Sequence, residues 1–214
     1  MLFRSACVFT LSSHHPYSIP EKYNGKFRKG TLPIHESIQY TDYALRKFFQ
    51  TASSMPWFDS TLFVITADHT ALSEVPFYHT SVGMYSIPVL YYRHNPSLKN
   101  ISSVTTQQTD ILPSVLHYLN YDEPFVAFGT SVFDSTSSHF AVNFQNDIYQ
   151  VIENGYALQA NTSETTGLYS YRTDSLLSRN LAGINHEAQK ELEKKLHAFI
   201  QQYNEAMIHN KLKP

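Results

Sequence analysis

TLFVITADH, residues 61–69, is continuously apolar in its middle and ends in two polar side chains. An uninterrupted run of this kind predicts a strand covered on both faces, as in α/β proteins. Asp68 and His69 follow directly at its carboxyl end. In open α/β sheets, ligands bind in the crevice outside the carboxyl ends of the strands. This short stretch therefore predicts both a fold class and a candidate site.

Strand and helix signals alternate on either side of this stretch. Apolar runs at Cys7–Leu11 and Ile87–Tyr92 predict two further buried strands. Apolar residues recur at every third or fourth position after Pro33, and again between Thr106 and Leu119, which predicts two amphipathic helices. Apolar strands that alternate with helices indicate an α/β fold with a mostly parallel sheet between helices.

The pattern changes near residues 135–138. The short apolar runs that follow are divided by Asn146-Asp147, Asn154-Gly155 and residues 161–167, and this spacing predicts an antiparallel meander of hairpins. Asn185 then provides the cap of a long C-terminal helix that extends to about Asn210.

Two parts are expected from this change of pattern. Residues 1–135 would form an incomplete α/β domain, and residues 136–214 a small meander with the C-terminal helix packed on it. The first residues already include a predicted core strand, so we expect the chain to begin in the middle of a larger domain.

Composition and charge exclude several classes of protein. The 214 residues are 42% hydrophobic and 14% aromatic, which permits a packed core and argues against general disorder. The net charge of −2 offers no basic face for nucleic acid. The lone Cys7 excludes an intrachain disulfide and a thiolate metal cluster, and within its predicted strand it should be a small buried side chain. No apolar stretch approaches the roughly 20 residues that cross a bilayer.

Asp68 and His69 are the first candidates for chemistry. A carboxylate oxygen beside an imidazole nitrogen is a suitable pair of metal ligands. The alternative is that Asp68 caps the following turn and His69 is a partly exposed loop residue. The sequence around them leaves both interpretations open.

His14 and His15 form a second candidate group, directly after the predicted strand Cys7–Leu11. If the strands are parallel and close, these rings face the same crevice as Asp68 and His69, where an imidazole can contact a phosphoryl or sulfuryl oxygen or bind metal. The alternative is a polar loop, since a chain with 11 histidines contains such pairs by chance. His79 could reach the same pocket. The remaining histidines considered lie on predicted helices, where surface or packing roles are expected: His35, His117, His197 and His209.

Several blocks of sequence together resemble the sulfatase family of the alkaline phosphatase superfamily. The similarity is greatest to its branch of lipoteichoic acid synthases and phosphoglycerol transferases. The blocks are FTLSSHHPYSIP (residues 9–20), ESIQYTDYALRKFF (36–49), TLFVITADHT (61–70), GMYSIPVLYY (83–92) and QQTDILPSVLHYLNYDEPFVAFGTSVF (107–133). Their order along the chain makes the resemblance far more specific than any single block.

The resemblance implies roles for three residues. Asp68 and His69 would ligate a divalent metal, commonly manganese, magnesium or zinc. His14, rather than His15, would contact the substrate. In this family the nucleophile and a further carboxylate ligand lie upstream of the histidine block, so both are expected to be absent from this chain. The sulfatase nucleophile signature C/S-x-P-x-R is also missing. Its nearest match begins at Ser54-Met55-Pro56, but Phe58 occupies the position of the arginine.

The resemblance also implies a function for the parent enzyme. It would transfer a phosphoglycerol or related phosphoryl headgroup from a membrane lipid, at the extracytoplasmic or periplasmic face of the inner membrane. Contact with the membrane would be made by N-terminal segments that this chain lacks, and the chain alone would be inactive. One alternative is a metal-dependent sulfatase or phosphodiesterase that acts on a soluble sulfate or phosphate ester. Another is a non-catalytic binding module, and neither requires a nucleic acid partner.

Overall fold

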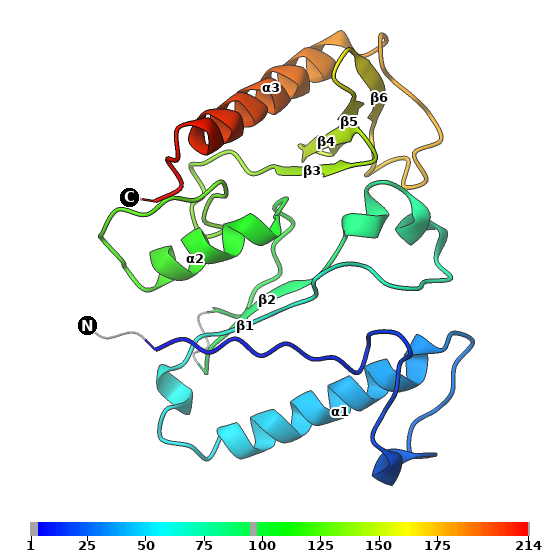
Figure 1. The fold of residues 1–214 in the computed structure, drawn as a ribbon, viewed down its shortest axis with the longest axis vertical. Coiled ribbons are helices and arrows are strands. Elements are labelled where there is room, and N and C mark those ends of the chain that lie inside the picture. The colour runs from blue at the N-terminus through cyan, green and yellow to red at the C-terminus, as the bar shows by residue number, and fades with distance from the viewer. Residues whose placement is uncertain (1–3, 95–97, 214) are drawn as a thin grey trace. The chain divides into compact units, whose positions relative to one another are not determined.

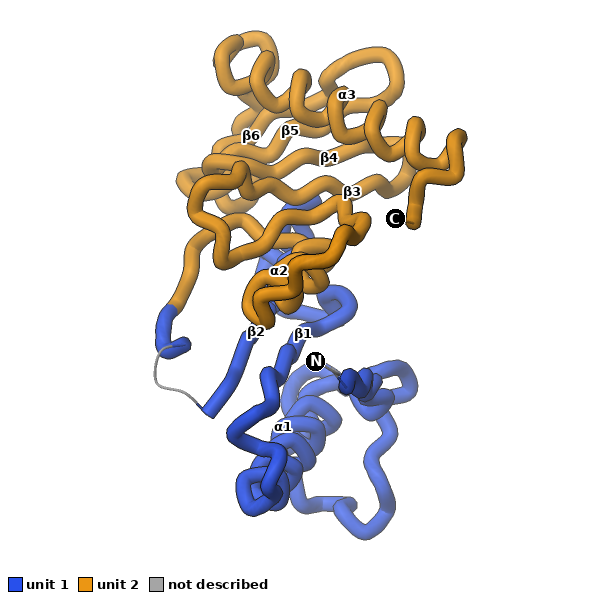
Figure 2. Tube along the Cα trace, turned by 90° about the vertical axis from the view of Figure 1, so that its left-hand side faces the viewer, with its two compact units in different colours: residues 1–100 blue, residues 101–214 orange. Residues whose placement is uncertain are grey.

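The computed structural model describes residues 4–94 and 98–213, which form two compact units (Figure 2). The first unit is residues 1–100 and the second is residues 101–214. The change in sequence pattern near residues 135–138 lies inside the second unit, and the domain boundary inferred from it remains a prediction.

The first unit contains one long helix and two short strands. Helix α1 (Ile34–Ala52) begins directly after Pro33, as predicted. Strands β1 (Phe63–Thr66) and β2 (Val89–Tyr92) lie within the two predicted apolar runs. The Phe49 ring of α1 lies 5.1 Å from the Phe63 ring and 5.5 Å from the Tyr92 ring, centroid to centroid. These aromatic contacts join the helix to both strands.

The pairing of β1 with β2 corrects one expectation. The two strands are antiparallel, with Phe63 opposite Tyr92 and Thr66 opposite Val89, whereas a mostly parallel sheet was predicted. The physical reason is the connection between them. It returns to the same end of β1 that it left, through two short 3-10 turns (Pro76–His79 and Gly83–Tyr85), and makes no crossover of the kind that a parallel pair needs. The prediction that both faces are covered was also wrong, because Leu90 is 52% exposed.

The segment Cys7–Leu11 is a second correction. It was predicted to be a buried strand, but it belongs to neither of the two sheets found in the described residues. The side chain of Val8 is 84% exposed, that of Phe9 is 67% exposed, and Cys7 is exposed rather than buried. An apolar run forms a core strand only where a neighbouring strand pairs with its backbone, and neither described sheet provides one here.

The second unit begins with a short helix and continues into the meander. Helix α2 (Ile111–Tyr118) follows a 3-10 turn (Gln108–Asp110) and lies inside the predicted helical range. The strands are β3 (Ala141–Gln145), β4 (Ile148–Glu153), β5 (Tyr156–Ala160) and β6 (Thr165–Tyr169). They pair antiparallel in chain order, which confirms the predicted meander (Figure 1).

The turns of the meander follow directly from the sequence. Asn146, Asp147, Asn154 and Gly155 all have positive φ, the conformation that two-residue hairpin loops demand and that Asn, Asp and Gly adopt at least cost. Glu153 therefore lies opposite Tyr156, and the register of β4 on β5 is set by local chemistry.

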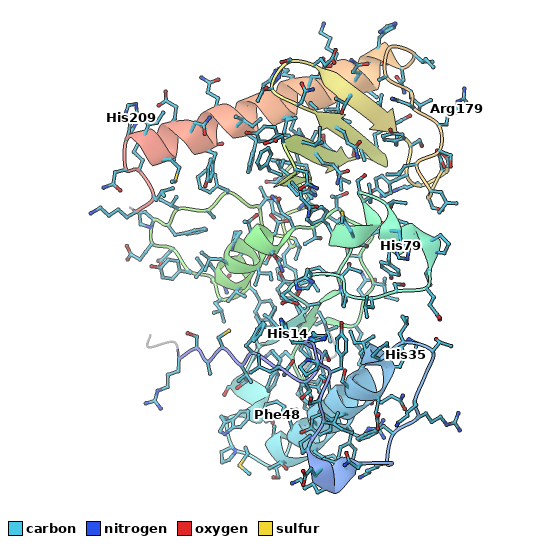
Figure 3. All side chains as sticks on the ribbon, turned by 45° about the vertical axis from the view of Figure 1, so that its right-hand side comes forward. His14, His35, Phe48, His79, Arg179 and His209 are labelled. Carbon is cyan, nitrogen blue, oxygen red and sulfur yellow. The ribbon has the colours of Figure 1, made fainter. Side chains whose placement is uncertain are left out.

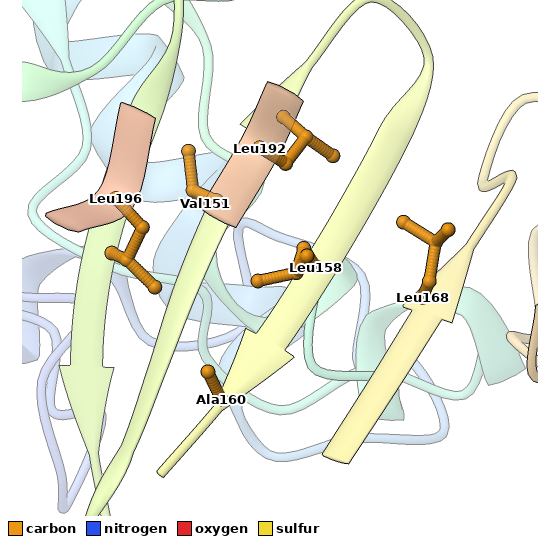
Figure 4. Close-up of a cluster of buried hydrophobic side chains, with 6 residues drawn as sticks. All are labelled: Val151, Leu158, Ala160, Leu168, Leu192 and Leu196. Atoms are coloured by element: carbon orange, nitrogen blue, oxygen red, sulfur yellow. The ribbon is translucent and has the colours of Figure 1, made fainter. Parts of the chain in front are cut away.

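Helix α3 (His186–Ile208) packs on β4 and β5 and completes this unit. Asn185 caps it as predicted, since its side-chain oxygen accepts a hydrogen bond from the backbone N–H of Ala188. The core between helix and sheet is a cluster of buried side chains (Figure 4): Val151, Leu158, Ala160, Leu168, Leu192 and Leu196. Within the described residues, none of the helices combines the length and apolar character that crossing a bilayer demands.

Candidate functional site

Asp68 and His69 lie just beyond the carboxyl end of β1, where the sequence predicted them. Only Ala67 separates them from the last residue of the strand. Their side chains are 55% and 67% exposed, so both are accessible to a ligand from solvent. The strand end thus presents a carboxylate and an imidazole next to each other on one loop.

Asp68 and His69 form hydrogen bonds with neighbouring backbone groups. The backbone N–H of His69 donates to Asp68 Oδ1 over 2.9 Å, and His69 Nδ1 lies 2.9 Å from the carbonyl oxygen of Thr70. A carbonyl oxygen can only accept, so Nδ1 carries the proton. In the neutral ring, Nε2 then holds the lone pair, and it lies 3.5 Å from Asp68 Oδ2.

This arrangement fits two ligands of one divalent metal. Two ligands of a tetrahedral zinc ion lie about 3.4 Å apart, given metal–ligand distances near 2 Å. Two electron-pair donors at this spacing repel each other unless a proton or a cation lies between them. Asp68 Oδ1 also accepts a local hydrogen bond from the backbone N–H of His69, and the alternative in which Asp68 caps the following turn stays a prediction. The two roles use different oxygens and are compatible.

A complete metal site is not formed by the part of the chain that the structure describes. Among those residues, no group of three or more His, Cys, Asp or Glu side chains could hold a metal ion together. His14 therefore does not complete a three-ligand cluster with Asp68 and His69. Within the described residues, Asp68 and His69 can supply two ligands of a metal.

Two threonines anchor this loop, and sequence reasoning did not single them out. Thr66 Oγ1 donates to the carbonyl oxygen of Pro88 over 3.0 Å. Thr70 Oγ1 donates to the carbonyl oxygens of Gly83 and Ser86, at 3.2 and 3.1 Å. The segment that carries Asp68 and His69 is thus tied on both sides to residues 83–88. Only the pattern T-x-D-H-T, a hydroxyl residue on each side of the pair, could have indicated this from the sequence.

His14 lies beside an open hollow of about 390 Å³, lined by Leu11, Ser12, His14, His15, Pro16 and Ser18. Its Nδ1 donates to the carbonyl oxygen of His15 over 2.8 Å, so the neutral ring holds its lone pair on Nε2. Ser13 Oγ lies 3.2 Å from Thr41 Oγ1 of α1 and joins this loop to the helix. The hollow can admit a small anion, which a protonated ring would contact favourably.

Four other histidines have local partners. His79 Nε2 donates to the carbonyl oxygen of Ser73 over 2.8 Å, and the residue lies on a different loop from His14 (Figure 3). His35 Nδ1 accepts from the backbone N–H of Leu32 at the start of α1. His117 Nδ1 contacts Ser131 Oγ at 2.9 Å, and His209 contacts Glu205 one helical turn away. The packing and surface roles predicted for His35, His117 and His209 agree with these contacts.

The family model of the sulfatases matches residues 5–121, which is more than half of the chain and includes both candidate groups. The chain belongs to the sulfatase family. The matched range ends just after α2, so this assignment rests on the first unit and on the start of the second. The family predicted from the sequence blocks is thereby confirmed.

Individual relatives agree with this family assignment. The chain is 24% identical to lipoteichoic acid synthase 1 of Bacillus subtilis (strain 168) over an alignment of 162 positions, and this alignment covers 66% of this chain and 25% of that protein. The sulfatase-family chain described here thus spans about a quarter of the length of this relative.

Solved structures agree with the fold. A protein in the alkaline phosphatase superfamily from Vibrio parahaemolyticus superposes with a TM-score of 0.77 at 21% identity, over 97% of this chain and 50% of that one. A Bacteroides thetaiotaomicron protein, described with the metabolism of multiple glycosaminoglycans, superposes with a TM-score of 0.69 at 19% identity, over 88% and 48%. The predicted fold class, an incomplete alkaline-phosphatase-like α/β domain with a meander and a C-terminal helix, is confirmed.

Proposed function

We propose that this chain supplies two metal ligands and a substrate-contacting histidine to a metal-dependent transferase of phosphoglycerol or related phosphoryl headgroups. The observation that carries the proposal is the spacing of 3.5 Å between Asp68 Oδ2 and His69 Nε2, at a strand end in a sulfatase-family chain. The similarity to lipoteichoic acid synthase 1 supports a lipid headgroup as the substrate, and with it an extracytoplasmic location of the parent enzyme.

Each of the three residues has a distinct role in this proposal. Asp68 Oδ2 and His69 Nε2 hold the metal. The hydrogen bond that Asp68 Oδ1 accepts and the one that His69 Nδ1 donates keep both groups in position. His14 contacts an oxygen of the phosphoryl group from its open hollow. A divalent metal such as manganese, magnesium or zinc would polarise the phosphoryl oxygen and activate a nucleophile.

The nucleophile is not among these residues in our proposal. The sequence contains no C/S-x-P-x-R signature. Because covalent group transfer needs an activated nucleophile, we expect the isolated chain to turn over no phosphodiester or sulfate ester. The expected contribution of the chain alone is metal and anion binding.

Calorimetry with the full chain tests the metal site. We expect binding of Mn²⁺ or Zn²⁺, weakened at least tenfold by Asp68→Asn and by His69→Ala, since each change removes a ligand. Asp59→Asn is the matched control, because Asp59 is also an exposed aspartate of the first unit. Binding that is equally strong in Asp68→Asn and in the unchanged chain would exclude Asp68 as a ligand.

A soluble sulfate ester is the second candidate substrate, and the structural similarity to the Bacteroides protein favours it. Titration with inorganic phosphate and inorganic sulfate, observed by NMR at His14, distinguishes the two. Preferential binding of phosphate supports headgroup transfer, and preferential binding of sulfate supports ester hydrolysis. Absence of both anion and metal binding would favour the other alternative, a non-catalytic binding module.

A further inference from the structure

We propose that Thr70 is a positioning residue for His69, which it holds in the orientation and tautomer that direct Nε2 toward Asp68. The inference rests on the proposed function, in which these two side chains bind a divalent metal. Thr70 itself does not contact the metal in this proposal. It acts through its backbone carbonyl and through the side chain that fixes this carbonyl in place.

The first step is the contact between Thr70 and the imidazole ring. The Thr70 carbonyl oxygen lies 2.9 Å from His69 Nδ1 and must accept the hydrogen bond. This contact selects the tautomer that is protonated at Nδ1. A neutral imidazole binds metal through its unprotonated nitrogen, and the group that bonds the other nitrogen sets which one that is.

The second step is the anchoring of Thr70. Its hydroxyl donates to the carbonyl oxygens of Gly83 and Ser86, and Thr70 is half-buried while Asp68 and His69 are exposed. Gly83 is buried against the loop around Phe77, where an added Cβ would lie 1.9 Å from the Phe77 carbonyl oxygen. The Thr70 carbonyl oxygen, which accepts the hydrogen bond from the exposed His69 ring, therefore belongs to a residue that is fixed to a closely packed part of the loop.

Thr66 provides the internal comparison. Its hydroxyl also anchors the segment, by donating to the carbonyl oxygens of Pro88 and Ala67. It lies on the other side of the pair, and the carbonyl that His69 uses belongs to Thr70 rather than to Thr66. Removal of the Thr66 hydroxyl should loosen the strand end without changing the tautomer of the ring.

The experiment uses the full chain and its valine and serine variants. Long-range ¹H–¹⁵N NMR at alkaline pH reports which ring nitrogen of His69 is protonated, and calorimetry with Zn²⁺ alone reports the metal affinity. Thr70→Val should populate the Nε2–H tautomer and weaken Zn²⁺ binding about tenfold, the lower limit for loss of a group that orients a metal ligand. Thr70→Ser keeps the hydroxyl and should retain both properties of the unchanged chain, whereas Thr66→Val should retain its tautomer.

Three results would overturn the inference. The first is a His69 tautomer in Thr70→Val that equals that of the unchanged chain. The second is equal effects of Thr70→Val and Thr66→Val, which would indicate general loosening of the loop. The third is a Thr70→Ser variant that behaves like Thr70→Val. If Thr70→Val does not fold, Thr70→Ala takes its place in the same comparison.

The two proposals fail in different ways. If the unchanged chain binds no Zn²⁺, the metal function fails, whereas the NMR spectrum still decides whether Thr70 sets the tautomer. If Zn²⁺ binds with the same affinity in every Thr70 variant, the metal function stands and the role of Thr70 is refuted.

Discussion

Lys195 of α3 and Glu153, the last residue of β4, form an ion pair that joins the C-terminal helix to the meander. The Lys195 ammonium group also contacts the hydroxyl of Ser138, which itself donates to Glu153 Oε1 over 2.6 Å. The side chains of Lys195 and Glu153 are only 24% and 11% exposed. Water therefore screens the attraction between their charges only weakly. One helix, one strand and the segment before β3 therefore meet at a single charged cluster.

Lys195→Met should lower the free energy of unfolding by about 1–3 kcal/mol, because Glu153 is then left charged and partly buried without its partner. Urea denaturation measures this change. Lys194→Met, at the exposed neighbouring position, should stay within about 0.5 kcal/mol of the unchanged chain. A double variant with Glu153→Gln should recover part of the loss, and a double variant less stable than either single one would contradict this account.

Leu196→Ala should cost about 2–5 kcal/mol, since Leu196 is 1% exposed and its truncation leaves a cavity in the cluster between α3 and the sheet. Ile208→Ala is the control on the same helix, because Ile208 is 76% exposed. Thermal and urea unfolding measure both variants. Equal stability losses in the two would mean that the helix does not pack on the meander through Leu196.

Asn185→Ala should cost about 1 kcal/mol, because the backbone N–H of Ala188 at the start of α3 loses its side-chain acceptor. Asn185→Ser keeps an acceptor and should recover most of that stability. Asn204→Ala, inside the helix and exposed, is expected to be neutral or slightly stabilising. The free energies of unfolding decide the matter, and a loss of stability in Asn204→Ala as large as in Asn185→Ala would refute a capping role.

Asp110 should give the stability of the chain a pH dependence of defined sign. Burial raises the pKa of its carboxyl group, although the backbone N–H groups of Gln107 and Thr130, which donate to it, act in the opposite direction. A carboxyl group whose pKa is higher in the folded state contributes stability at low pH. That contribution is lost as the pH rises from the unfolded-state value of about 3.9 through the folded-state value.

Asp110→Asn removes this pH dependence. It also leaves the backbone N–H of Gln107 or of Thr130 without an acceptor oxygen, which should lower the free energy of unfolding by about 1–3 kcal/mol. The difference in stability between the unchanged chain and the variant should therefore shrink as the pH rises above 4, as urea denaturation across that range would show. Asp122→Asn, at an exposed position, should show no such trend. A difference that grows with pH would reverse the assigned sign.

The meander and the C-terminal helix of the second unit were predictable because short-range sequence signals determine them. The Asn-Asp and Asn-Gly pairs at the hairpin turns adopt positive φ and fix the register of the neighbouring strands. The cap at Asn185 likewise marks the start of α3 within one residue. Each of these signals acts over a few residues, and a single sequence contains all of them.

The first unit was harder because strand pairing depends on distant segments. The apolar runs at β1 and β2 were correctly predicted as strands, but their relative direction depends on the path of the 22 residues between Thr66 and Val89. The apolar composition of Cys7–Leu11 likewise favours burial, but it does not identify a strand with which the segment would pair. The structure leaves Val8 and Phe9 exposed.

The candidate site likewise has one part that the sequence predicts and one part that depends on contacts between distant segments. Asp68 and His69 are adjacent in sequence, so their meeting at a strand end was predictable. The hydroxyl contacts of Thr66 and Thr70 with residues 83–88 were not, because they join segments whose proximity only the folded chain reveals.

The apolar segment Cys7–Leu11 also affects how the chain behaves in solution. An accessible stretch outside both described sheets is open to proteases, which cut preferentially near chain termini and at exposed loops. Cleavage by chymotrypsin should therefore begin at Phe9, which is 67% exposed, and proceed later through the meander. The lifetime of the chain in a cell extract would then depend on this segment rather than on the strength of its core.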